Sequence, residues 1–525
     1  MAGEDYEQRQ LWRVNARRAI ETHAPAPAIQ LTFDPALSVT SFADSPDATK
    51  IVFSAAPKPL LSSAGEQDLY LLDLHRDNTV RKIVALRGPD TSPMFSPDGT
   101  RLAFLTSLGR ADYLYANHRI GLIDLAAAVA RPASRPADVR DISTGFDESP
   151  QPIAWVDGGL YFKATRRVAT PLFRVDMAKG RIQEVTQGQG WIIDDVSLTP
   201  DGRSVAFIAE DSSHMTELYV SSARLFSPRR LTDVTAQADG WTVGGTEVVS
   251  WKSKDGLTIE GVLRKPADFD PKRRYPLLVM IHGGPTSASQ PRFLPADGAY
   301  PVQALLAKGA LVLEPNYRGS AGYGAAFRAL NVRNLGVGDT WDVMSGIDFL
   351  VDRGMADPHR LGAMGWSQGG YICAFLSTHV QRFKAISVGA GISDWTTYYV
   401  GTDINQFATQ YFQATPWEDP RIYARSSPIT TIRLARTPTL IQQGGADQRV
   451  PVANALELYR GLLDQHVDAR LIIYSGSGHD LDKPKSLLAA QRANLDWFSH
   501  HLWAEPFPVD SALYGAGEST RASFR

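Results

Sequence analysis

The chain has 525 residues, more than one hydrophobic core usually holds, which predicts two domains. Its net charge of −2, with no long basic run, argues against a nucleic-acid partner. A single cysteine excludes an intrachain disulfide framework, and no apolar stretch reaches the roughly 18 residues of a membrane span. Because residues 1–10 also lack the apolar core of a signal peptide, we expect a cytoplasmic protein with no membrane partner.

The N-terminal segment, residues 1–24, is predicted to hold a short helix. Residues 4–22 are rich in charge and carry scattered apolar side chains such as Leu11 and Trp12, a pattern typical of an amphipathic helix. The Ala-Pro-Ala-Pro sequence over 24–27 would end this helix, because proline cannot continue it.

Residues 25–246 are predicted to form an all-β, propeller-like domain. Short β-rich runs alternate with turn clusters, and a Pro-Asp-Gly turn before a strand occurs at 97–99 and again at 200–202. One β-rich run recurs about every 50 residues, and its copies end at Asp73, Asp124, Asp176 and Ser222. Strand repeats of roughly 40–50 residues are typical of propeller blades, and the segment would hold about four to five of them. The alternative is an irregular β-sandwich with coincidental turns.

Residues 247–503 are predicted to form a doubly wound, mostly parallel sheet. A hairpin turned by Asp255-Gly256 comes first, and continuous apolar strands then alternate with helical patterns, as in a sheet covered on both faces. The expected strands lie at 277–281, 310–314, 361–364, 385–388, 439–442 and 471–474, and the expected helices near 340–353, 368–379, 451–465 and 485–502. The tail, 504–525, is expected to be coil.

The chemistry is predicted to centre on Ser367. An apolar strand ends in the sequence Gly-Trp-Ser-Gln-Gly over 365–369, and a helical pattern follows at once. Gly-x-Ser-x-Gly between a strand and a helix is the nucleophile elbow, a strained turn that exposes the serine hydroxyl. Gly365 and Gly369 would be required because side chains there would clash with neighbouring elements.

A serine hydroxyl needs a base and a carboxylate that orients the base. In an α/β-hydrolase these groups follow the serine in the order Asp or Glu, then His. Asp447 follows the strand that begins at Thr439, and His479 follows the strand that begins at Leu471. Loops at the carboxyl ends of parallel strands converge at one edge of the sheet, so we predict a Ser367–Asp447–His479 triad. A surface-loop histidine and a helix-capping aspartate are the alternatives.

An oxyanion hole is expected beside Ser367. One donor would be the backbone N–H of Gln368, and the other would come from the glycines that follow the strand at 277–281, with Gly284 favoured over Gly283. His282 would be a second base or, as the favoured interpretation, a hydrogen-bonded part of the loop floor.

The combination of these motifs resembles the prolyl oligopeptidase family of serine peptidases, in its acylaminoacyl-peptidase-like branch. The resemblance covers about residues 248–503. Its motifs include His-Gly-Gly-Pro over 282–285, Asn-Tyr-Arg-Gly-Ser over 316–320, the elbow, Asp-Gln-Arg-Val-Pro over 447–451 and the Gly-His that ends at 479.

The resemblance implies further features. The helix within residues 1–24 would pack on the hydrolase domain, and the propeller would cap the active site. Arg449 would bind a substrate carbonyl, and Trp395, Tyr398 and Tyr399 would line the pocket for the residue before the scissile bond. These aromatic residues would be equally ordinary in a core. Family propellers usually have seven blades in a longer segment, so here either blades are missing, which is the favoured interpretation, or the repeats are compressed.

The predicted function is hydrolysis of peptide bonds in short or acylated peptides through an acyl-enzyme. A specialised isopeptidase or esterase would use the same triad, and a non-catalytic propeller scaffold is the remaining alternative. The motifs imply no cofactor or metal, and the expected partners are a peptide substrate and, as one possible assembly, a second copy in a homodimer.

Overall fold

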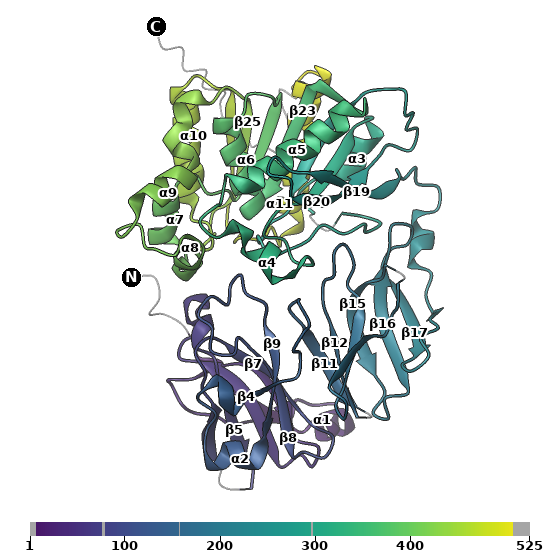
Figure 1. The fold of residues 1–525 in the computed structure, drawn as a ribbon, viewed down its shortest axis with the longest axis vertical. Coiled ribbons are helices and arrows are strands. Elements are labelled where there is room, and N and C mark those ends of the chain that lie inside the picture. The colour runs from purple at the N-terminus through teal and green to yellow at the C-terminus, as the bar shows by residue number, and fades with distance from the viewer. Residues whose placement is uncertain (1–6, 76–78, 157, 189, 296–297, 508–525) are drawn as a thin grey trace. The chain divides into compact units, whose positions relative to one another are not determined.

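The computed structural model describes residues 7–75, 79–156, 158–188, 190–295 and 298–507. The chain divides into two compact units (Figure 1). The N-terminal unit comprises Met1–Asp239 and Ala321–Leu330, and the C-terminal unit comprises Gly240–Ser320 and Asn331–Arg525. The predicted boundary at 246/247 therefore lies inside the C-terminal unit, and the predicted continuous domain 247–503 is interrupted by the segment 321–330.

Four antiparallel sheets of four strands each make up most of the described part of the N-terminal unit. In every sheet the strands follow one another in chain order, as in a propeller blade. The first two sheets contain β3 (Ser38–Asp44), β4 (Lys50–Ala56), β5 (Asp68–Asp73), β6 (Thr79–Val84), β7 (Asp90–Phe95), β8 (Arg101–Thr106), β9 (Arg119–Asp124) and β10 (Arg140–Asp141). The other two contain β11 (Gln151–Val156), β12 (Gly159–Lys163), β13 (Leu172–Asp176), β14 (Arg181–Glu184), β15 (Ile192–Leu198), β16 (Ser204–Glu210), β17 (Glu217–Ser222) and β18 (Arg229–Arg230).

The sequence repeat corresponds to the third strand of each sheet. Asp73, Asp124, Asp176 and Ser222 are the last residues of β5, β9, β13 and β17. Neighbouring sheets share hydrophobic cores: Leu102 and Phe104 of the second sheet pack with the first, and Phe162 of the third packs with Leu122 of the second. Sheets that are neighbours in chain order are therefore packed on one another. A helix, α2 (Leu125–Ala130), follows β9.

The N-terminal segment differs from the prediction. Its described part holds a strand, β1 (Trp12–Val14), and a short helix, α1 (Ala16–Thr22), and β1 pairs with β2 (Ala28–Gln30). Leu11 is buried in the core of the first sheet, and its backbone N–H donates to Thr32 Oγ1 at 2.9 Å. The expectation of a helix that packs on the hydrolase domain is therefore corrected: these residues belong to the N-terminal unit, while residues 1–6 lie outside the described part.

The C-terminal unit is built on one eight-stranded sheet in the order β19-β20-β22-β21-β23-β24-β25-β26. Their bounds are β19 (Thr246–Lys252), β20 (Thr258–Arg264), β21 (Tyr275–Ile281), β22 (Leu311–Asn316), β23 (Ala356–Trp366), β24 (Ala385–Gly389), β25 (Thr439–Gly444) and β26 (Ala469–Tyr474). The hairpin β19–β20 is antiparallel to its neighbour β22, and β22 through β26 run parallel. The predicted mostly parallel sheet is confirmed.

Helices cover both faces of this sheet (Figure 1). Those of this unit are α3 (Val302–Ala307), α5 (Gly338–Asp352), α6 (Gln368–His379), α7 (Trp395–Gly401), α8 (Asn405–Phe412), α9 (Pro420–Ser426), α10 (Val452–Asp464) and α11 (Pro484–Trp503). α3 and α11 share a core with one face of the sheet, and α5 and α6 pack together on the other. The predicted tail begins where α11 ends, and residues 508–525 lie outside the described part.

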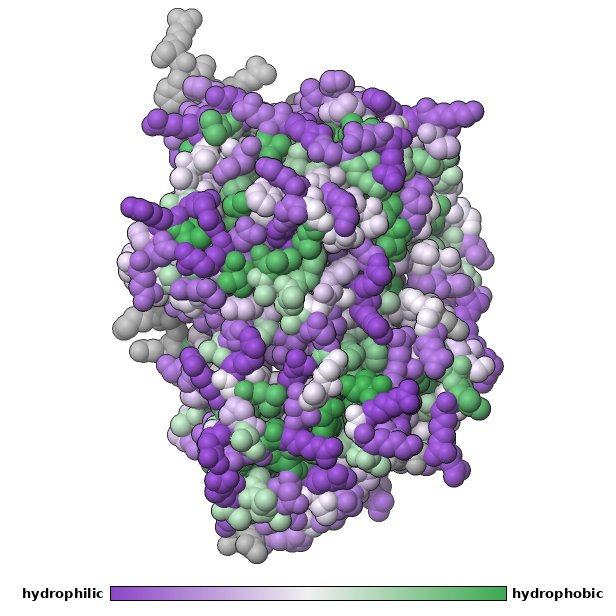
Figure 2. Space-filling model, in the orientation of Figure 1, coloured by the Kyte–Doolittle hydropathy of each residue, from purple (hydrophilic) through white to green (hydrophobic). Residues whose placement is uncertain are grey.

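Hydrophilic residues are spread over the face shown in Figure 2, and hydrophobic residues occur there in separate patches. Among the described helices, none combines the length and the apolar composition that a membrane crossing requires.

Candidate active site

Ser367 occupies the turn between β23 and α6. Its φ is 59° and its ψ is −121°, a conformation that costs a non-glycine residue about 1–3 kcal/mol. Hydrogen bonds hold it in place: its N–H donates to Gly389 O at 2.9 Å, and its carbonyl accepts from Tyr371 N at 2.8 Å. A side chain at Gly369 would collide with the Ile281 carbonyl, and one at Gly365 would collide with the Gly369 backbone. The two glycines are therefore needed for the reason that the sequence predicted.

Three side chains from neighbouring strand ends meet beside this turn. Ser367 Oγ lies 2.9 Å from His479 Nε2, and His479 Nδ1 lies 2.8 Å from Asp447 Oδ2. Asp447 follows β25 and His479 follows β26, so the parallel sheet brings them to one edge. Because a carboxylate only accepts hydrogen bonds, Nδ1 carries the ring proton, and Nε2 is free to accept from the serine hydroxyl.

The Asp447 carboxylate is buried and fixed by four donors. Oδ1 accepts from the backbone N–H groups of Arg449 at 2.8 Å and Val450 at 2.9 Å. Oδ2 accepts from His479 and from Gln443 Nε2, which lies 2.9 Å away. Gln443 is fully buried, and sequence reasoning missed it. The available signal was an amide side chain inside a buried strand, where it must find a partner.

Trp366 is a second residue that sequence reasoning missed. Its indole Nε1 donates to the His479 backbone carbonyl at 2.8 Å. The residue directly before the serine therefore holds the histidine loop. The only signal in the sequence was a tryptophan directly before the elbow serine. From this position alone, the hydrogen-bond partner of the indole could not be predicted.

The residues predicted for the oxyanion hole lie around Ser367. Gln368 is the first residue of α6, so its backbone N–H is one of the free donors of a helix N-terminus. A Cβ at Gly283 would lie 3.3 Å from Ser367 Cβ, so this glycine packs directly against Ser367. Gly284 has a φ of +121°, and a side chain there would clash with the backbone of Thr286. Which of the two glycines donates to an oxyanion stays a prediction.

His282 forms part of the loop floor, as the favoured interpretation had it. Nδ1 lies 2.8 Å from the Gly283 carbonyl oxygen, Nε2 lies 3.0 Å from Ser320 Oγ, and the ring stacks on Tyr317 with 4.5 Å between centroids. Burial lowers its pKa to about 4, so the ring is neutral at physiological pH. Both ring nitrogens are engaged, which leaves neither free to act as a second base.

The four residues predicted to bind substrate divide into two groups. Trp395 has no exposed surface and Tyr398 has 2%, because both pack with the aromatic side chains of α8. They are core residues, so the expectation that they line an open pocket is corrected. Tyr399 is partly exposed. Arg449 is also partly exposed, and its Nε donates to Asp403 Oδ1 at 2.8 Å.

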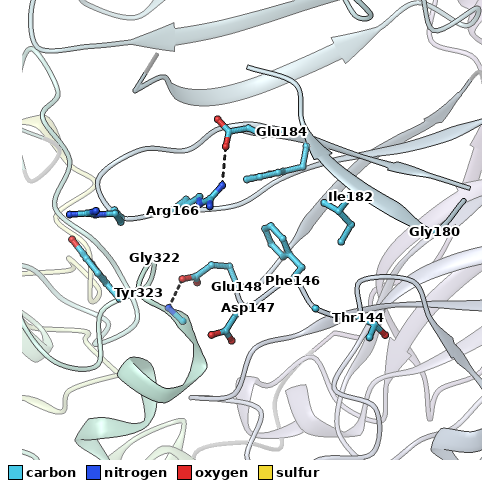
Figure 3. A pocket seen from close by; sticks show the side chains of 14 residues that line it. Thr144, Phe146, Asp147, Glu148, Arg166, Gly180, Ile182, Glu184, Gly322 and Tyr323 are labelled. Carbon is cyan, nitrogen blue, oxygen red and sulfur yellow. Dashed lines mark hydrogen bonds and ion pairs between the residues drawn. The ribbon is translucent and has the colours of Figure 1, made fainter. Parts of the chain in front are cut away.

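Each of the two units holds a cavity within its described residues. One of about 240 Å³ in the C-terminal unit is lined by His282, Gly283 and Glu314, among others, so its wall includes the glycine that packs on Ser367. A larger one of about 750 Å³ lies in the N-terminal unit between the segment 322–324 and the loop 144–148 (Figure 3).

Hydrogen bonds at the wall of the larger cavity tie residues 321–330 to the N-terminal unit. Glu148 Oε1 accepts from Gly324 N at 2.6 Å (Figure 3). Asp147 Oδ1 accepts from Ala325 N at 3.1 Å. Gly322 O accepts from Arg167 N at 2.7 Å. The two carboxylates thus bind the start of α4 (Gly324–Arg328). None of the predicted site residues lines this cavity.

Comparison with known proteins shows which proteins this chain is similar to. Residues 299–504 match the model of the prolyl oligopeptidase family. The chain is 25% identical over 475 residues to dipeptidyl-peptidase 5 of Porphyromonas gingivalis. The aligned region covers 88% of this chain and 67% of that protein. It is 30% identical over 239 residues to the acylamino-acid-releasing enzyme of Arabidopsis thaliana. This aligned region covers 43% of this chain and 30% of that protein.

A solved structure shows the same fold. The acylaminoacyl peptidase of Pyrococcus horikoshii superposes with a TM-score of 0.76 at 23% identity, covering 93% of this chain and 74% of that one. The elbow, the strand-end order and these matches agree with one another. Residues 299–504 therefore match the prolyl oligopeptidase family, and the chain is a serine peptidase similar to members of that family.

Proposed function

We propose that this protein hydrolyses amide bonds of short or acylated peptides, with Ser367 as nucleophile, His479 as base and Asp447 as orienting carboxylate. The observation that carries the proposal is the continuous hydrogen-bonded line from Ser367 Oγ to His479, 2.9 Å, and from His479 to Asp447, 2.8 Å. A nucleophile and a base within this distance, with the base oriented by a third group, is the arrangement that nucleophilic catalysis requires.

The reaction has two halves. Ser367 Oγ attacks the substrate carbonyl carbon while His479 Nε2 takes the hydroxyl proton, and the N–H groups of Gln368 and Gly284 hold the oxyanion. The intermediate collapses as the C–N bond breaks and His479 gives the proton to the leaving amine. Water then attacks the acyl-enzyme, its proton passes to His479, and the carboxylic acid leaves as Ser367 regains a proton.

The substrate class rests on two lines of support. The matched relatives are named as a dipeptidyl peptidase and as an acylamino-acid-releasing enzyme. The chain spans at most about two thirds of either relative. Arg449 keeps guanidinium N–H groups beyond the one that binds Asp403, so we assign it to a substrate carbonyl, and Tyr399 to the wall of the substrate pocket.

We further propose that the N-terminal unit is a reduced propeller. Its four described sheets, each a four-stranded meander packed on the next in chain order, support four blades in place of seven. A specialised isopeptidase or esterase with the same triad is the second candidate, since nothing in the triad distinguishes an amide from an ester.

The test is hydrolysis of N-acyl-amino-acid and peptide p-nitroanilides beside the matching esters. We expect anilide turnover that Ser367→Ala lowers about 10³-fold or more. Ser377→Ala is the matched control, because Ser377 is a buried serine of α6 whose hydroxyl donates to Ala374 O. Ester turnover without any anilide turnover would show that the protein is an esterase and would contradict the proposed peptidase function. Activity that survives in Ser367→Ala would overturn both candidates.

A further inference from the structure

Asp403 is the only carboxylate that the Arg449 side chain binds among the described residues. Arg449 Nε donates to Asp403 Oδ1 at 2.8 Å, and the two side chains keep 30% and 29% of their surface exposed. A guanidinium has five N–H donors, and this contact uses one of them. Within the part of the chain that the structure describes, no hydrogen bond engages Nη1 or Nη2. The outer edge of the guanidinium is therefore left for a ligand.

Asp403 lies between α7 and α8, and hydrogen bonds of its backbone segment fix its place. Its own N–H donates to Gln448 O at 2.9 Å, and the preceding Thr402 donates its hydroxyl to Arg449 O at 2.7 Å. The segments that carry the two charges are thus joined by bonds that do not involve the Asp403 carboxylate. A substitution of that carboxylate leaves both bonds in place.

The Arg449 backbone is bonded to the proposed triad. Its N–H donates to Asp447 Oδ1 at 2.8 Å, and Asp447 Oδ2 lies 2.8 Å from His479 Nδ1. One carboxylate therefore fixes both the base and the residue that carries the guanidinium. The Arg449–Asp403 ion pair borders the edge of the sheet at which the proposed function places the substrate.

The Asp403 charge changes which group Arg449 binds most favourably. An unpaired guanidinium prefers a carboxylate, with which it forms two charge-assisted hydrogen bonds. A carboxylate on the outer edge of Arg449 would face the Asp403 carboxylate across the same guanidinium, and like charges repel. A neutral carbonyl accepts from the same N–H groups without this repulsion. The pair, which is neutral as a whole, therefore favours a carbonyl over a carboxylate.

We propose that Asp403 is a positioning residue that sets specificity: it makes the Arg449 subsite select neutral acyl and peptide carbonyls and reject carboxylates. This inference rests on the proposed function and narrows its substrate class to peptides whose acyl end carries no carboxylate. Asp403 acts through Arg449 and has no contact with the reacting atoms in this assignment.

The test compares N-succinyl- and N-succinamoyl-aminoacyl p-nitroanilides, which differ only in a terminal carboxylate or amide. Asp403→Asn removes the charge and keeps an oxygen that accepts from Arg449 Nε. We expect kcat/KM for the succinamoyl anilide to stay within about twofold, while the succinyl-to-succinamoyl ratio of kcat/KM rises about fivefold. Because salt screens exposed charges, this rise should shrink in about 0.5 M NaCl, which a loss of structure would not cause.

Asp403→Ala also removes the acceptor that holds Arg449. Its KM for the succinamoyl anilide should rise about threefold, the scale of an exposed ion pair, while kcat and fluorophosphonate labelling of Ser367 change far less. Asp403→Glu should restore part of both KM and selectivity. Asp419→Asn is the matched control, because Asp419 is 30% exposed and pairs with Arg333 at 2.7 Å in the same unit. Its ratio should equal that of the unaltered chain.

The inference is overturned if Asp403→Asn leaves the succinyl-to-succinamoyl ratio unchanged, or if Asp419→Asn raises it equally. Should Asp403→Asn fail to fold, Arg449→Gln decides by the opposite sign: Asp403 is then unpaired, so the ratio must fall, and an unchanged ratio overturns the inference. Failure of the proposed function looks different, because the unaltered chain would then leave both anilides intact or Ser367→Ala would still cleave them.

Discussion

The indole Nε1 of Trp366 donates a hydrogen bond to the main-chain carbonyl of His479 at 2.8 Å. The residue that precedes Ser367 therefore anchors the loop that carries His479. Ser367 and His479 lie 112 residues apart in the chain, and this bond joins their two loops independently of the Ser367–His479 contact. Rigid placement of both groups is what a general base within hydrogen-bond reach demands.

Trp366→Phe keeps the aromatic ring and removes the donor. We expect kcat on a peptide anilide to fall about tenfold, because a loosened His479 loop spends less time within reach of Ser367. Trp497→Phe is the matched control: Trp497 is 1% exposed, and its Nε1 has no hydrogen-bond partner within the described residues. Equal kcat in the two variants would contradict this role.

Gln443→Met removes the side-chain amide that donates to Asp447 Oδ2 at 2.9 Å. With one of its donors gone, the Asp447 carboxylate should orient His479 less well, and we expect kcat to fall about tenfold and stability by about 1–3 kcal/mol. Gln442→Met tests specificity, because this neighbouring buried glutamine bonds Ser387 and Asn494 instead. It should lose stability alone, measured by urea unfolding, and a comparable kcat loss there would refute the assignment.

Arg318 is expected to be structural. Its guanidinium binds Asp342 at 2.8 Å and Asp255 at 2.9 Å, and Asp342 has no exposed surface. Arg318→Met leaves a buried carboxylate unpaired, which should lower the free energy of unfolding of the C-terminal unit by about 3–5 kcal/mol. The exposed pair Arg382–Asp348 offers the comparison, and Arg382→Met should cost less than about 1 kcal/mol. If thermal or urea unfolding shows that both variants lose a similar free energy of unfolding, the buried Arg318 network contributes no more than an exposed ion pair.

The buried carboxyl of Asp90 should make the stability of the N-terminal unit depend on pH. Burial raises its pKa to about 7, although Thr106 Oγ1 and Leu86 N both donate to it. The folded state thus holds the proton more tightly than the unfolded chain, whose aspartates titrate near pH 4. The stabilisation from this proton is complete below about pH 4 and is lost as the pH rises to about 7.

The unfolding temperature should therefore fall between pH 5 and pH 8, and Asp90→Asn should reduce that fall. Asp98→Asn is the control, because hydrogen bonds from Ser96 Oγ and then Thr100 lower the pKa of this exposed carboxyl to about 2, outside the range measured. An unchanged pH difference in Asp90→Asn would exclude Asp90 as its source.

Much of the C-terminal unit could be predicted from the sequence because its signals are local. Continuous apolar runs marked the buried parallel strands, and the glycines of the elbow marked a turn that only small residues permit. The order of Ser367, Asp447 and His479 then followed from strand ends that converge at one edge of a sheet. Repeats of the third strand likewise marked the sheets of the N-terminal unit.

The features that were missed depend on contacts between distant segments. Leu11 packs in the core of the first sheet, and residues 321–330 bind Asp147 and Glu148. The periodicity of the sequence indicates neither of these two contacts. Trp395 looked like a pocket residue because it follows a site-bearing strand. It is buried because α8 packs over it, and no strong sequence pattern marks that short helix.

The most direct test of the central claim is intact-protein mass spectrometry after reaction with a fluorophosphonate, followed by peptide mapping. We expect one adduct per chain, located on Ser367, absent in Ser367→Ala and formed about 10³-fold more slowly in His479→Ala. An adduct on another residue, or labelling of Ser367 that is equally fast without the His479 imidazole, would contradict the account.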